Sequence, residues 1–315
     1  MYDVAIIGGG PAGLQAALTL GRMHRRAVLL DGQRYRNATV RHMHNLIGSD
    51  GRDPAELRGA ARRELARYET VDSRATEVIR IDGTVGSFSL TLVGGEIVEA
   101  TRVILATGVA DTLPDVPGLA PLFGTIAAHC PFCHGHEFAA TAVALIGAGA
   151  HAPRLAAMLR PIATGVVVLA HGEAIDPDVA RALERLDAVI RSERIVSVAP
   201  APHGAEVALE GGGTVSVGGI LTTTQWRQAA PFAEQLGLAM TPAGVIAVDA
   251  FGRTSVPGIS AAGDAAVGPG LPGPMHAVAL SIAAGLTAAA SIVQDLVAAE
   301  LANSSDGGSR SHAAG

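Results

Sequence analysis

The only two cysteines in this 315-residue chain are Cys130 and Cys133, with two residues between them. Thiols at this spacing can close a disulfide across one turn, and a helix that begins at the pair lowers the pKa of the thiol there. His129, His134 and His136 flank the pair, and an imidazole exchanges protons near neutral pH. The segment therefore predicts thiol–disulfide redox chemistry, with His129 or His134 as the base that generates thiolates.

Other interpretations of this segment stay open. The cysteines can be half of a zinc site or two buried thiols, and the histidines can simply satisfy hydrogen bonds at a helix end. A zinc site needs two more ligands, and because no second cysteine pair exists, His129, His134 and His136 would have to supply them. We favour redox chemistry and expect no metal, because a dinucleotide-binding frame surrounds the pair.

A glycine-rich turn near the N-terminus begins that frame. A short apolar strand is followed by Gly8, Gly10 and Gly13 at the start of an Ala/Leu-rich helix. In a dinucleotide fold the first glycine permits a tight turn, the second lets backbone approach a pyrophosphate, and the third lets helix and strand pack closely. The next apolar strand ends in Asp31, whose carboxylate can bind ribose hydroxyls. The alternative is a plain glycine-rich turn with a solvated aspartate.

A second strand–turn–helix pattern follows the cysteines. The apolar segment 142–146 leads into the turn Gly147-Ala148-Gly149, which predicts a second nucleotide fold. The next strand, 166–170, is followed by acidic residues and by no Lys or Arg as far as Asp178. Because a 2′-phosphate is held by arginines, NADPH is disfavoured, whereas NADH bound through Glu173 stays open.

Several other segments have assignable roles. The polar, aperiodic segment 34–53 is too long for an ordinary connection and predicts a site loop. Alternation over residues 76–98 predicts an antiparallel meander, and the Pro- and Gly-containing segment 113–118 predicts a linker between domains. Asp264 follows an apolar strand and suits a buried cofactor hydroxyl, with a helix cap as the alternative.

The composition excludes several classes of protein. A chain of 315 residues with 49% hydrophobic residues and 39 glycines is typical of a two-domain α/β protein, and a net charge of −6 argues against a nucleic-acid surface. No signal peptide precedes the first strand, so we expect a cytoplasmic protein. The uncharged run 277–293 is slightly short for a membrane span and suits a helix packed on a sheet, so we expect no membrane partner. Residues 303–315 are small and polar, which predicts a disordered tail.

The order of these motifs resembles the FAD-dependent, low-molecular-weight thioredoxin reductases over nearly the whole chain. The strongest matches are residues 8–13, Ala106-Thr107-Gly108, the Cys130/Cys133 pair and residues 253–264. The resemblance implies FAD as the cofactor and a homodimer as the assembly. It implies that the residues that contact FAD are Gly8, Gly10, Pro11, Ala12, Gly13, Asp31, Gly32, Gln33, Asn45, Val78, Ala106, Thr107, Gly108, Gly263, Asp264 and Ala277.

The same resemblance implies an α/β fold with two Rossmann-like, three-layer ββα nucleotide-binding domains. The FAD domain is discontinuous and consists of residues 1–112 and 243–302. The second domain, residues 113–242, carries the cysteine pair.

The chain departs from thioredoxin reductases at two places. His134 stands where those enzymes have an aspartate directly after the second cysteine, and His171-Gly172-Glu173 replaces their arginine-rich NADPH signature. Residues 129–135 are instead similar to the dithiol oxidases that close disulfides in gliotoxin, holomycin and romidepsin. Those flavoenzymes resemble thioredoxin reductase but run in the opposite direction, without NADPH, and pass electrons to oxygen.

This second resemblance implies a FAD-dependent dithiol oxidase acting on a small-molecule, natural-product dithiol. A substrate thiolate attacks the Cys130–Cys133 disulfide, and the second substrate thiol displaces Cys130 and closes the product disulfide. Cys133 passes the electrons to FAD, and O2 is reduced to hydrogen peroxide. Two alternatives stay open: an NAD(P)H-dependent thioredoxin or disulfide reductase, and a non-catalytic flavoprotein that serves as a docking module or redox sensor.

Overall fold

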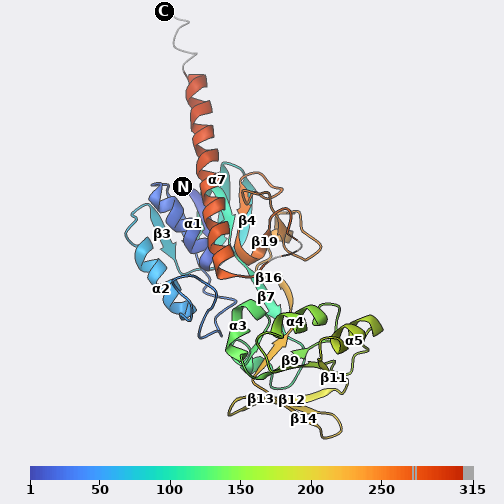
Figure 1. The fold of residues 1–315 in the computed structure, drawn as a ribbon. Coiled ribbons are helices and arrows are strands. Elements are labelled where there is room, and N and C mark those ends of the chain that lie inside the picture. The colour runs from blue at the N-terminus through green and yellow to red at the C-terminus, as the bar shows by residue number, and fades with distance from the viewer. Residues whose placement is uncertain (272, 274, 308–315) are drawn as a thin grey trace, which may run out of the picture. The chain divides into compact units, whose positions relative to one another are not determined.

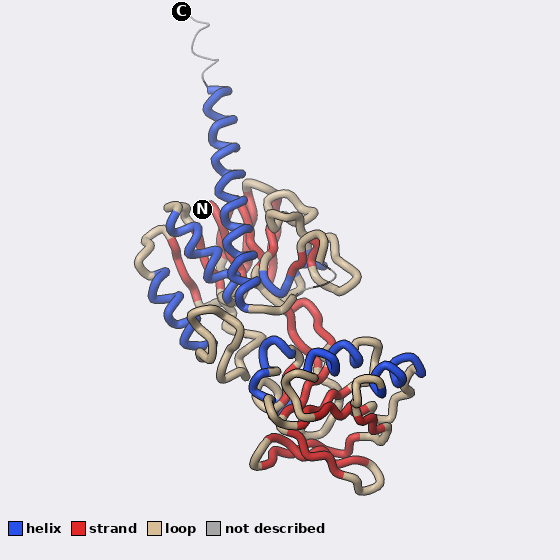
Figure 2. Tube along the Cα trace, viewed as in Figure 1, coloured by secondary structure: helices blue, strands red, loops and turns tan. Residues whose placement is uncertain are grey.

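The structure, a computed structural model, describes residues 1–271, 273 and 275–307, and it divides into two compact units. Unit 1 contains residues 1–36, residues 55–110 and the chain from residue 227 onward. Unit 2 contains residues 37–54 and 111–226. Helices and strands are present in both units, as Figure 1 shows along the chain and Figure 2 shows by type of secondary structure.

Unit 1 is built on a seven-stranded sheet. Its strands are β1 (Tyr2–Ile7), β2 (Ala27–Leu30), β3 (Val71–Arg74), β4 (Val78–Thr84), β5 (Ser87–Leu92), β6 (Ile97–Leu105) and β18 (Ile259–Ala261). The order is β3-β2-β1-β6-β5-β4, and β6 pairs with β5 over its first half and with β18 over its second half. β1, β2, β3, β6 and β18 are parallel, so their carboxyl ends share one edge of the sheet. The antiparallel strands β4, β5 and β6 confirm the predicted meander.

Both faces of this sheet are covered, which explains why β1 is apolar throughout. Val4 and Ile6 point into one hydrophobic core, and the alternating residues Ala5 and Ile7 point into another. The helices and short elements of unit 1 are α1 (Pro11–Arg22), α2 (Pro54–Leu65), α6 (Phe232–Gln235), α7 (Val278–Gly307), the 3-10 turn η3 (Gly263–Ala265), and the paired strands β17 (Ile246–Ala247) and β19 (Ala266–Val267).

Helices α1 and α7 lie side by side on one face of the sheet (Figure 1). A Cβ added at Gly285 of α7 would lie 2.1 Å from the carbonyl oxygen of Ala12, so only glycine fits where the helices meet. Among the described residues, α7 is the one helix that is long and apolar enough to cross a membrane by length and composition, and 39% of its most apolar window is buried. Its buried face, which includes Ala288 and Ile292, packs in the same core as α1.

Unit 2 is built on a five-stranded parallel sheet in the order β11-β10-β9-β15-β8. These strands are β8 (Ala127–Ala128), β9 (Ala142–Ile146), β10 (Gly165–Leu169), β11 (Val189–Arg191) and β15 (Gly219–Thr222). A second, antiparallel sheet contains β12 (Ile195–Ala201), β13 (Gly204–Leu209) and β14 (Thr214–Val217). The helical elements are η1 (Ala120–Leu122), α3 (Pro131–His134), η2 (His136–Phe138), α4 (Ala152–Leu159) and α5 (Pro177–Glu184).

The predicted fold class is confirmed, because both units contain a Rossmann-like strand–turn–helix–strand. In unit 1 it is β1-α1-β2, and in unit 2 it is β9-α4-β10, with the two strands of each pair parallel and adjacent. The chain passes between the units through β7 (Val109–Thr112) and β16 (Gln225–Gln228), which pair with each other.

The units differ from the expected domains over two segments, and the C-terminal tail also differs from its prediction. Residues 227–242 belong to unit 1, because Phe232 and Leu238 are buried in the same core as Phe88. Residues 37–54 belong to unit 2, although we expected them in the FAD domain. In the expected disordered tail, α7 continues through Gly307, and the rest of that tail lies outside the described residues.

Candidate functional site

The two cysteines lie at the start of α3 and form a disulfide, with their Cα atoms 5.3 Å apart. β8 delivers the chain to Cys130, whose carbonyl oxygen accepts hydrogen bonds from the amides of Cys133 and His134, each at 3.2 Å. This turn brings both sulfurs to the same side of the backbone. Both cysteines are partly exposed, so the disulfide is open to exchange with an external thiolate.

The helix predicted at the cysteine pair is only one turn long. α3 covers four residues, and a separate 3-10 turn, η2, follows Gly135. Because a helix macrodipole builds up from aligned peptide units, so short a helix contributes little of the dipole expected there. A Cβ at Gly135 would lie 2.4 Å from the carbonyl oxygen of Pro131, so glycine is needed for the chain to turn there.

The two candidate bases, His129 and His134, lie in different surroundings. The His129 ring stacks on Phe123, with ring centroids 5.8 Å apart and planes at 25°. His134 is more enclosed: burial lowers its pKa below the ordinary value of 6.5, and the charge of Glu137 and a backbone hydrogen bond with Gly124 offset this only in part. His134 is therefore neutral at pH 7, the state that accepts a proton.

The three glycines of the first turn occupy the three environments that a dinucleotide site requires. Gly8 has φ +108°, which permits the tight turn, and a Cβ at Gly13 would lie 1.8 Å from the carbonyl oxygen of Gly8. A Cβ at Gly10 would meet nothing within 4 Å. The backbone at Gly10, at the N-terminus of α1, is thus left open for a pyrophosphate, and this arrangement fits FAD.

Asp31, at the end of β2, is a buried carboxylate with several hydrogen-bond donors. Oδ1 accepts from the Gln33 amide at 2.9 Å, and Oδ2 accepts from the Tyr35 hydroxyl and from Nη2 of Arg62, both at 2.6 Å. Burial raises the pKa of Asp31, but the hydrogen bonds from Tyr35, Gln33 and Arg62 lower it more, so the pKa falls below its usual range. Asp31 is therefore held ionised, as an acceptor of ribose hydroxyls must be. Arg58 stacks on the Tyr35 ring at 4.0 Å.

Asp264, in η3, is a second enclosed carboxylate at the same edge of the sheet. Nη1 of Arg36 donates to its Oδ2 at 2.9 Å, Nδ1 of His276 lies 3.5 Å from the same oxygen, and the Ser281 hydroxyl donates to Oδ1 at 3.4 Å. Burial raises the pKa of Asp264, but His276 and Arg36 lower it more. Its carboxylate is therefore ionised and bound from two sides.

The remaining residues expected to contact FAD lie mostly at the carboxyl ends of parallel strands in unit 1. Residues 8–13, 31–33, 106–108 and 263–264 follow β1, β2, β6 and β18, whose carboxyl ends share one edge. Val78 begins β4, and the preceding Glu77 forms an ion pair with Arg34 at 2.6 Å, which holds this strand beside the segment after Asp31. Ala277 directly precedes α7.

Asn45 is the exception, because it belongs to unit 2. It has φ +60°, and its amide donates to Oδ1 of Asp50 at 2.7 Å. Sequence reasoning missed Tyr35, Arg36, Arg62 and His276, which surround the two carboxylates. No motif marks them, since each reaches its partner from a loop or from the face of a helix.

The glycine turn of unit 2 begins like that of unit 1 but leads differently into its helix, because α4 begins three residues after Gly149 whereas α1 begins directly after Gly10. Gly147 has φ +101° and permits the tight turn, as Gly8 does. A Cβ at Gly149, the counterpart of Gly10, would lie 3.1 Å from Cε1 and 3.3 Å from Nδ1 of His151. The His151 ring therefore lies against one side of Gly149, although both residues are exposed to solvent. Partial burial lowers the pKa of His151, so the ring is neutral at pH 7 and offers no charge to a phosphate.

The turn after β10 has contacts that its sequence did not indicate. Nδ1 of His171 accepts a hydrogen bond from the Ile195 amide at 2.9 Å, so this ring fastens the turn to β12. Arg194, distant in sequence, lies against the same turn: a Cβ at Gly172 would be 2.8 Å from its Cγ. Arg194 thus lies beside the turn after β10, although residues 171–178 include no arginine.

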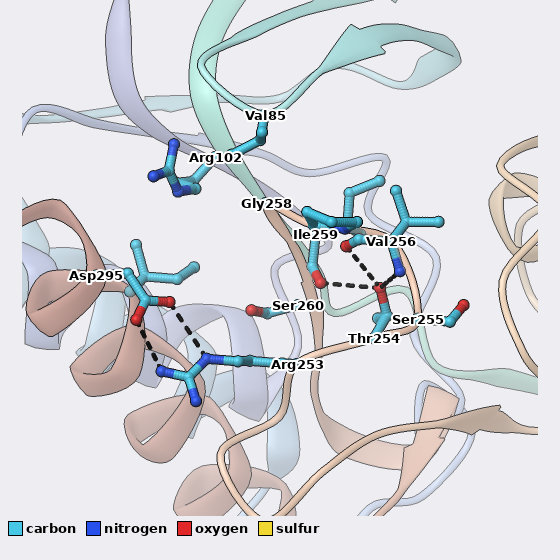
Figure 3. A pocket seen from close by; sticks show the side chains of 12 residues that line it. Val85, Arg102, Arg253, Thr254, Ser255, Val256, Gly258, Ile259, Ser260 and Asp295 are labelled. Carbon is cyan, nitrogen blue, oxygen red and sulfur yellow. Dashed lines mark hydrogen bonds and ion pairs between the residues drawn. The ribbon is translucent and has the colours of Figure 1, made fainter. Parts of the chain in front are cut away.

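A surface cavity of about 400 Å³ lies elsewhere in unit 1 (Figure 3). Its wall is the strap before β18, where the Thr254 hydroxyl donates to the Ile259 carbonyl at 2.9 Å and Arg253 forms a bidentate ion pair with Asp295 of α7. These contacts give a structural role to residues 253–264, one of the segments on which the resemblance to thioredoxin reductases rests. In the part of the chain that the structure describes, no group of three or more His, Cys, Asp and Glu side chains is arranged to hold a metal ion.

Comparison with known proteins agrees with this geometry. The model of the pyridine nucleotide-disulphide oxidoreductase family matches residues 2–284. Thioredoxin reductase sirT of Leptosphaeria maculans is 33% identical over 322 residues, covering 96% of each chain. Thioredoxin reductase aclD of Aspergillus oryzae is 32% identical over 312 residues, covering 94% of this chain and 96% of its own. The crystal structure of HlmI is similar with a TM-score of 0.88 and 31% identity, covering 99% of this chain and 98% of its own.

Proposed function

Because the chain belongs to the pyridine nucleotide-disulphide oxidoreductase family, we propose that it is a FAD-dependent dithiol oxidase. Family membership makes it an oxidoreductase and a flavoprotein of the thioredoxin reductase type. The proposal adds a direction and a substrate: the enzyme forms a disulfide in a small-molecule dithiol, O2 is the electron acceptor, and hydrogen peroxide is the second product.

The Cys130–Cys133 disulfide supplies the first half of this chemistry. A substrate thiolate attacks the sulfur of Cys130, so a mixed disulfide forms and Cys133 leaves as a thiolate. The second substrate thiolate attacks the substrate sulfur of that mixed disulfide, closes the product disulfide and releases Cys130. The substrate has then lost two electrons and two protons, and the cysteine pair has gained the two electrons.

His134 is suited to take the proton of the attacking substrate thiol, and the Cys133 thiolate released in that step can take the proton of the second. His134 directly follows Cys133, and because burial lowers its pKa it is neutral at pH 7. FAD, when bound, accepts the two electrons of the cysteine pair and delivers them to oxygen. The residues that would hold it include Gly8 and Gly10 in the first glycine turn and the ionised carboxylates of Asp31 and Asp264.

The observation that carries the direction of electron flow is the His151 ring beside Gly149. The same position in the first nucleotide fold, Gly10, has nothing within 4 Å of an added Cβ. A nicotinamide dinucleotide bound to unit 2 would need its pyrophosphate near Gly149, where the ring already packs. The acidic residue Glu173 near the adjoining turn also repels a 2′-phosphate. Both features favour oxygen over NADPH.

One observation favours a second candidate function, an NADPH-dependent disulfide reductase with the opposite electron flow. Arg194 lies against the turn at Gly172, where an arginine can bind a 2′-phosphate. The reductase would need the His151 ring to move away from Gly149.

A stopped-flow experiment separates the two functions. We expect anaerobic dithiothreitol to bleach the flavin, and readmitted air to restore it with stoichiometric release of hydrogen peroxide. NADPH and NADH, tested separately, should not bleach it at a comparable rate. Rapid bleaching by either nicotinamide would reject the oxidase and support the reductase.

A further inference from the structure

A loop from the N-terminal third of the chain packs against the cysteine segment inside unit 2. Residues 37–54 lie beside α3, visible in Figure 1 as a dark blue loop next to the green turn. The contact is close at Gly124, where an added Cβ would lie 2.7 Å from Oγ1 of Thr39 and 3.0 Å from its backbone. The loop closes on itself through the bridge between Met43 and Arg52, with the Met43 amide donating to the Arg52 carbonyl at 2.9 Å.

This loop places His44 between two carboxylates. Nε2 of His44 lies 3.3 Å from Oε1 of Glu137, and Nδ1 lies 3.6 Å from Oδ1 of Asp50. The His44 side chain is 18% exposed, whereas Asp50 is 69% exposed, so the cluster runs from the interior of unit 2 towards solvent. The His44 ring meets the His134 ring edge-on, with centroids 6.4 Å apart and planes at 77°.

His134 thus has charged or titratable neighbours on two elements. Glu137, in η2, contacts His44, and its charge raises the pKa of His134. His44, in the loop, lowers that pKa when protonated, and a backbone hydrogen bond with Gly124 raises it. Nδ1 of His134 is buried and has no hydrogen-bond partner among the described residues.

We propose that His44, held between Asp50 and Glu137, is a positioning residue that engages the Glu137 carboxylate and so limits the negative charge available to stabilise protonated His134. The inference rests on the proposed function, because it assigns His134 the proton lost by the attacking substrate thiol. That proton leaves a substrate S–H and binds His134, while the electrons of the new thiolate form the bond to Cys130 and the Cys130–Cys133 bond breaks. A carboxylate engaged by His44 stabilises the resulting imidazolium less than a free one does.

The two partners of His134 therefore have opposite effects, which a merely structural cluster would not produce. Removing His44 frees Glu137 and removes a competing positive charge, so His134 becomes protonated at higher pH. Removing the Glu137 charge makes His134 harder to protonate. The two changes should therefore shift the pKa of His134 in opposite directions.

The test uses the FAD-loaded full chain and dithiothreitol as the dithiol, with the rate of anaerobic flavin bleaching measured across pH. We expect the fall in rate on the acid side to move to higher pH in His44→Asn and to lower pH in Glu137→Gln. His42→Asn is the matched control, since His42 lies in the same loop with an exposed ring that contacts the Gly51 carbonyl at 3.0 Å. His44→Gln serves as a second variant if His44→Asn does not fold.

A direct titration makes the inference independent of the oxidase proposal. The pKa of His134, followed by NMR in protein labelled at histidine carbons, should shift in the same opposite directions in the two variants. Shifts in one common direction, or no shift relative to His42→Asn, would overturn the inference. If dithiothreitol fails to bleach the wild-type flavin while the NMR shifts are opposite, the oxidase proposal fails and the proton coupling stands.

Discussion

Gly10→Ala tests the cofactor site in a way that separates binding from folding. Gly10 precedes α1 with φ −74° and ψ −178°, an extended conformation that alanine adopts without strain. The added methyl group meets no protein atom within 4 Å, so the fold can accept it. It would occupy the space in which we expect the FAD pyrophosphate to contact backbone, so the cost should fall on cofactor binding.

The expected magnitudes follow from this local structure. Alanine is a poorer N-cap than glycine by roughly 0.7 kcal/mol, but it also restricts the unfolded chain, which stabilises by about 0.4–1 kcal/mol. These effects nearly cancel, so the free energy of unfolding of the apoprotein should change by less than about 0.5 kcal/mol. Forcing an extra methyl group into a packed contact costs about 1–3 kcal/mol, which corresponds to as much as a 100-fold loss of FAD affinity.

The assay compares thermal unfolding of apoprotein and FAD-reconstituted protein, together with bound flavin measured by absorbance. With FAD at 100 times its dissociation constant, the wild type gains about 2.7 kcal/mol, and a 100-fold weaker variant gains about 0.4 kcal/mol. The difference of about 2.3 kcal/mol lowers the Tm of the reconstituted protein by about 5 °C or more. Gly165→Ala is the control, because its added Cβ also meets nothing within 4 Å but lies at the start of β10 in unit 2. Full FAD occupancy in Gly10→Ala and in the bulkier Gly10→Val would refute the assignment.

Three further outcomes are expected. Cys130→Ser and Cys133→Ser should each retain FAD, because neither cysteine lies in unit 1, but each variant should lose anaerobic bleaching of the flavin by dithiothreitol. Bleaching at the wild-type rate in either variant would exclude the cysteine pair from the mechanism and support the non-catalytic flavoprotein. Burial lowers the pKa of His134 below 6.5, so the midpoint of the acid-side fall in bleaching rate should lie below pH 6.5; a midpoint above pH 6.5 contradicts this. The free energy of unfolding should also decline as pH drops below 6.5, because the unfolded chain then binds the proton more readily. Arg253→Ala should lower the free energy of unfolding in urea by less than about 1 kcal/mol despite the bidentate ion pair, because the side chains of Arg253 and Asp295 are 41% and 39% exposed. A loss of several kcal/mol would contradict the expectation that solvent screens this ion pair.

Much of the backbone was predictable from the sequence because it depends on local patterns. Apolar strands that end in glycine turns specify both nucleotide folds, and alternation specifies the meander after residue 76. The glycine positions also carry their roles, since Gly8 and Gly13 are required by the turn and by the close approach of helix to strand. Asp31 and Asp264 were identifiable because each follows an apolar strand and lies at the edge where parallel strands end.

The side chains around those positions were not predictable, because they arrive from segments without a period. Arg36 meets Asp264 across 228 residues of chain, and the loop that holds His44 meets Glu137 across more than 90. The short length of α3 was missed for a different reason: a proline at its first position and a histidine-rich segment indicate where a helix starts but not that Gly135 ends it after one turn.

The two glycine turns, at residues 8–10 and 147–149, share a sequence motif but differ in the side chains around it. Both have a glycine at positive φ and a second glycine two residues later, so their sequences predict the same ligand. The difference is His151, two residues beyond Gly149, whose ring lies against one side of that glycine, while the residues after Gly10 leave its backbone open. His151→Ala should remove the ring from beside Gly149 without changing its backbone. If the ring beside the turn is what excludes nicotinamides, this variant should bind NADH measurably more tightly than the wild type in fluorescence titration. Arg160→Ala, at the opposite end of α4, is the control. If all three proteins bind NADH equally weakly, the negative charge of Glu173 in the turn after β10, rather than the His151 ring, excludes the nucleotide.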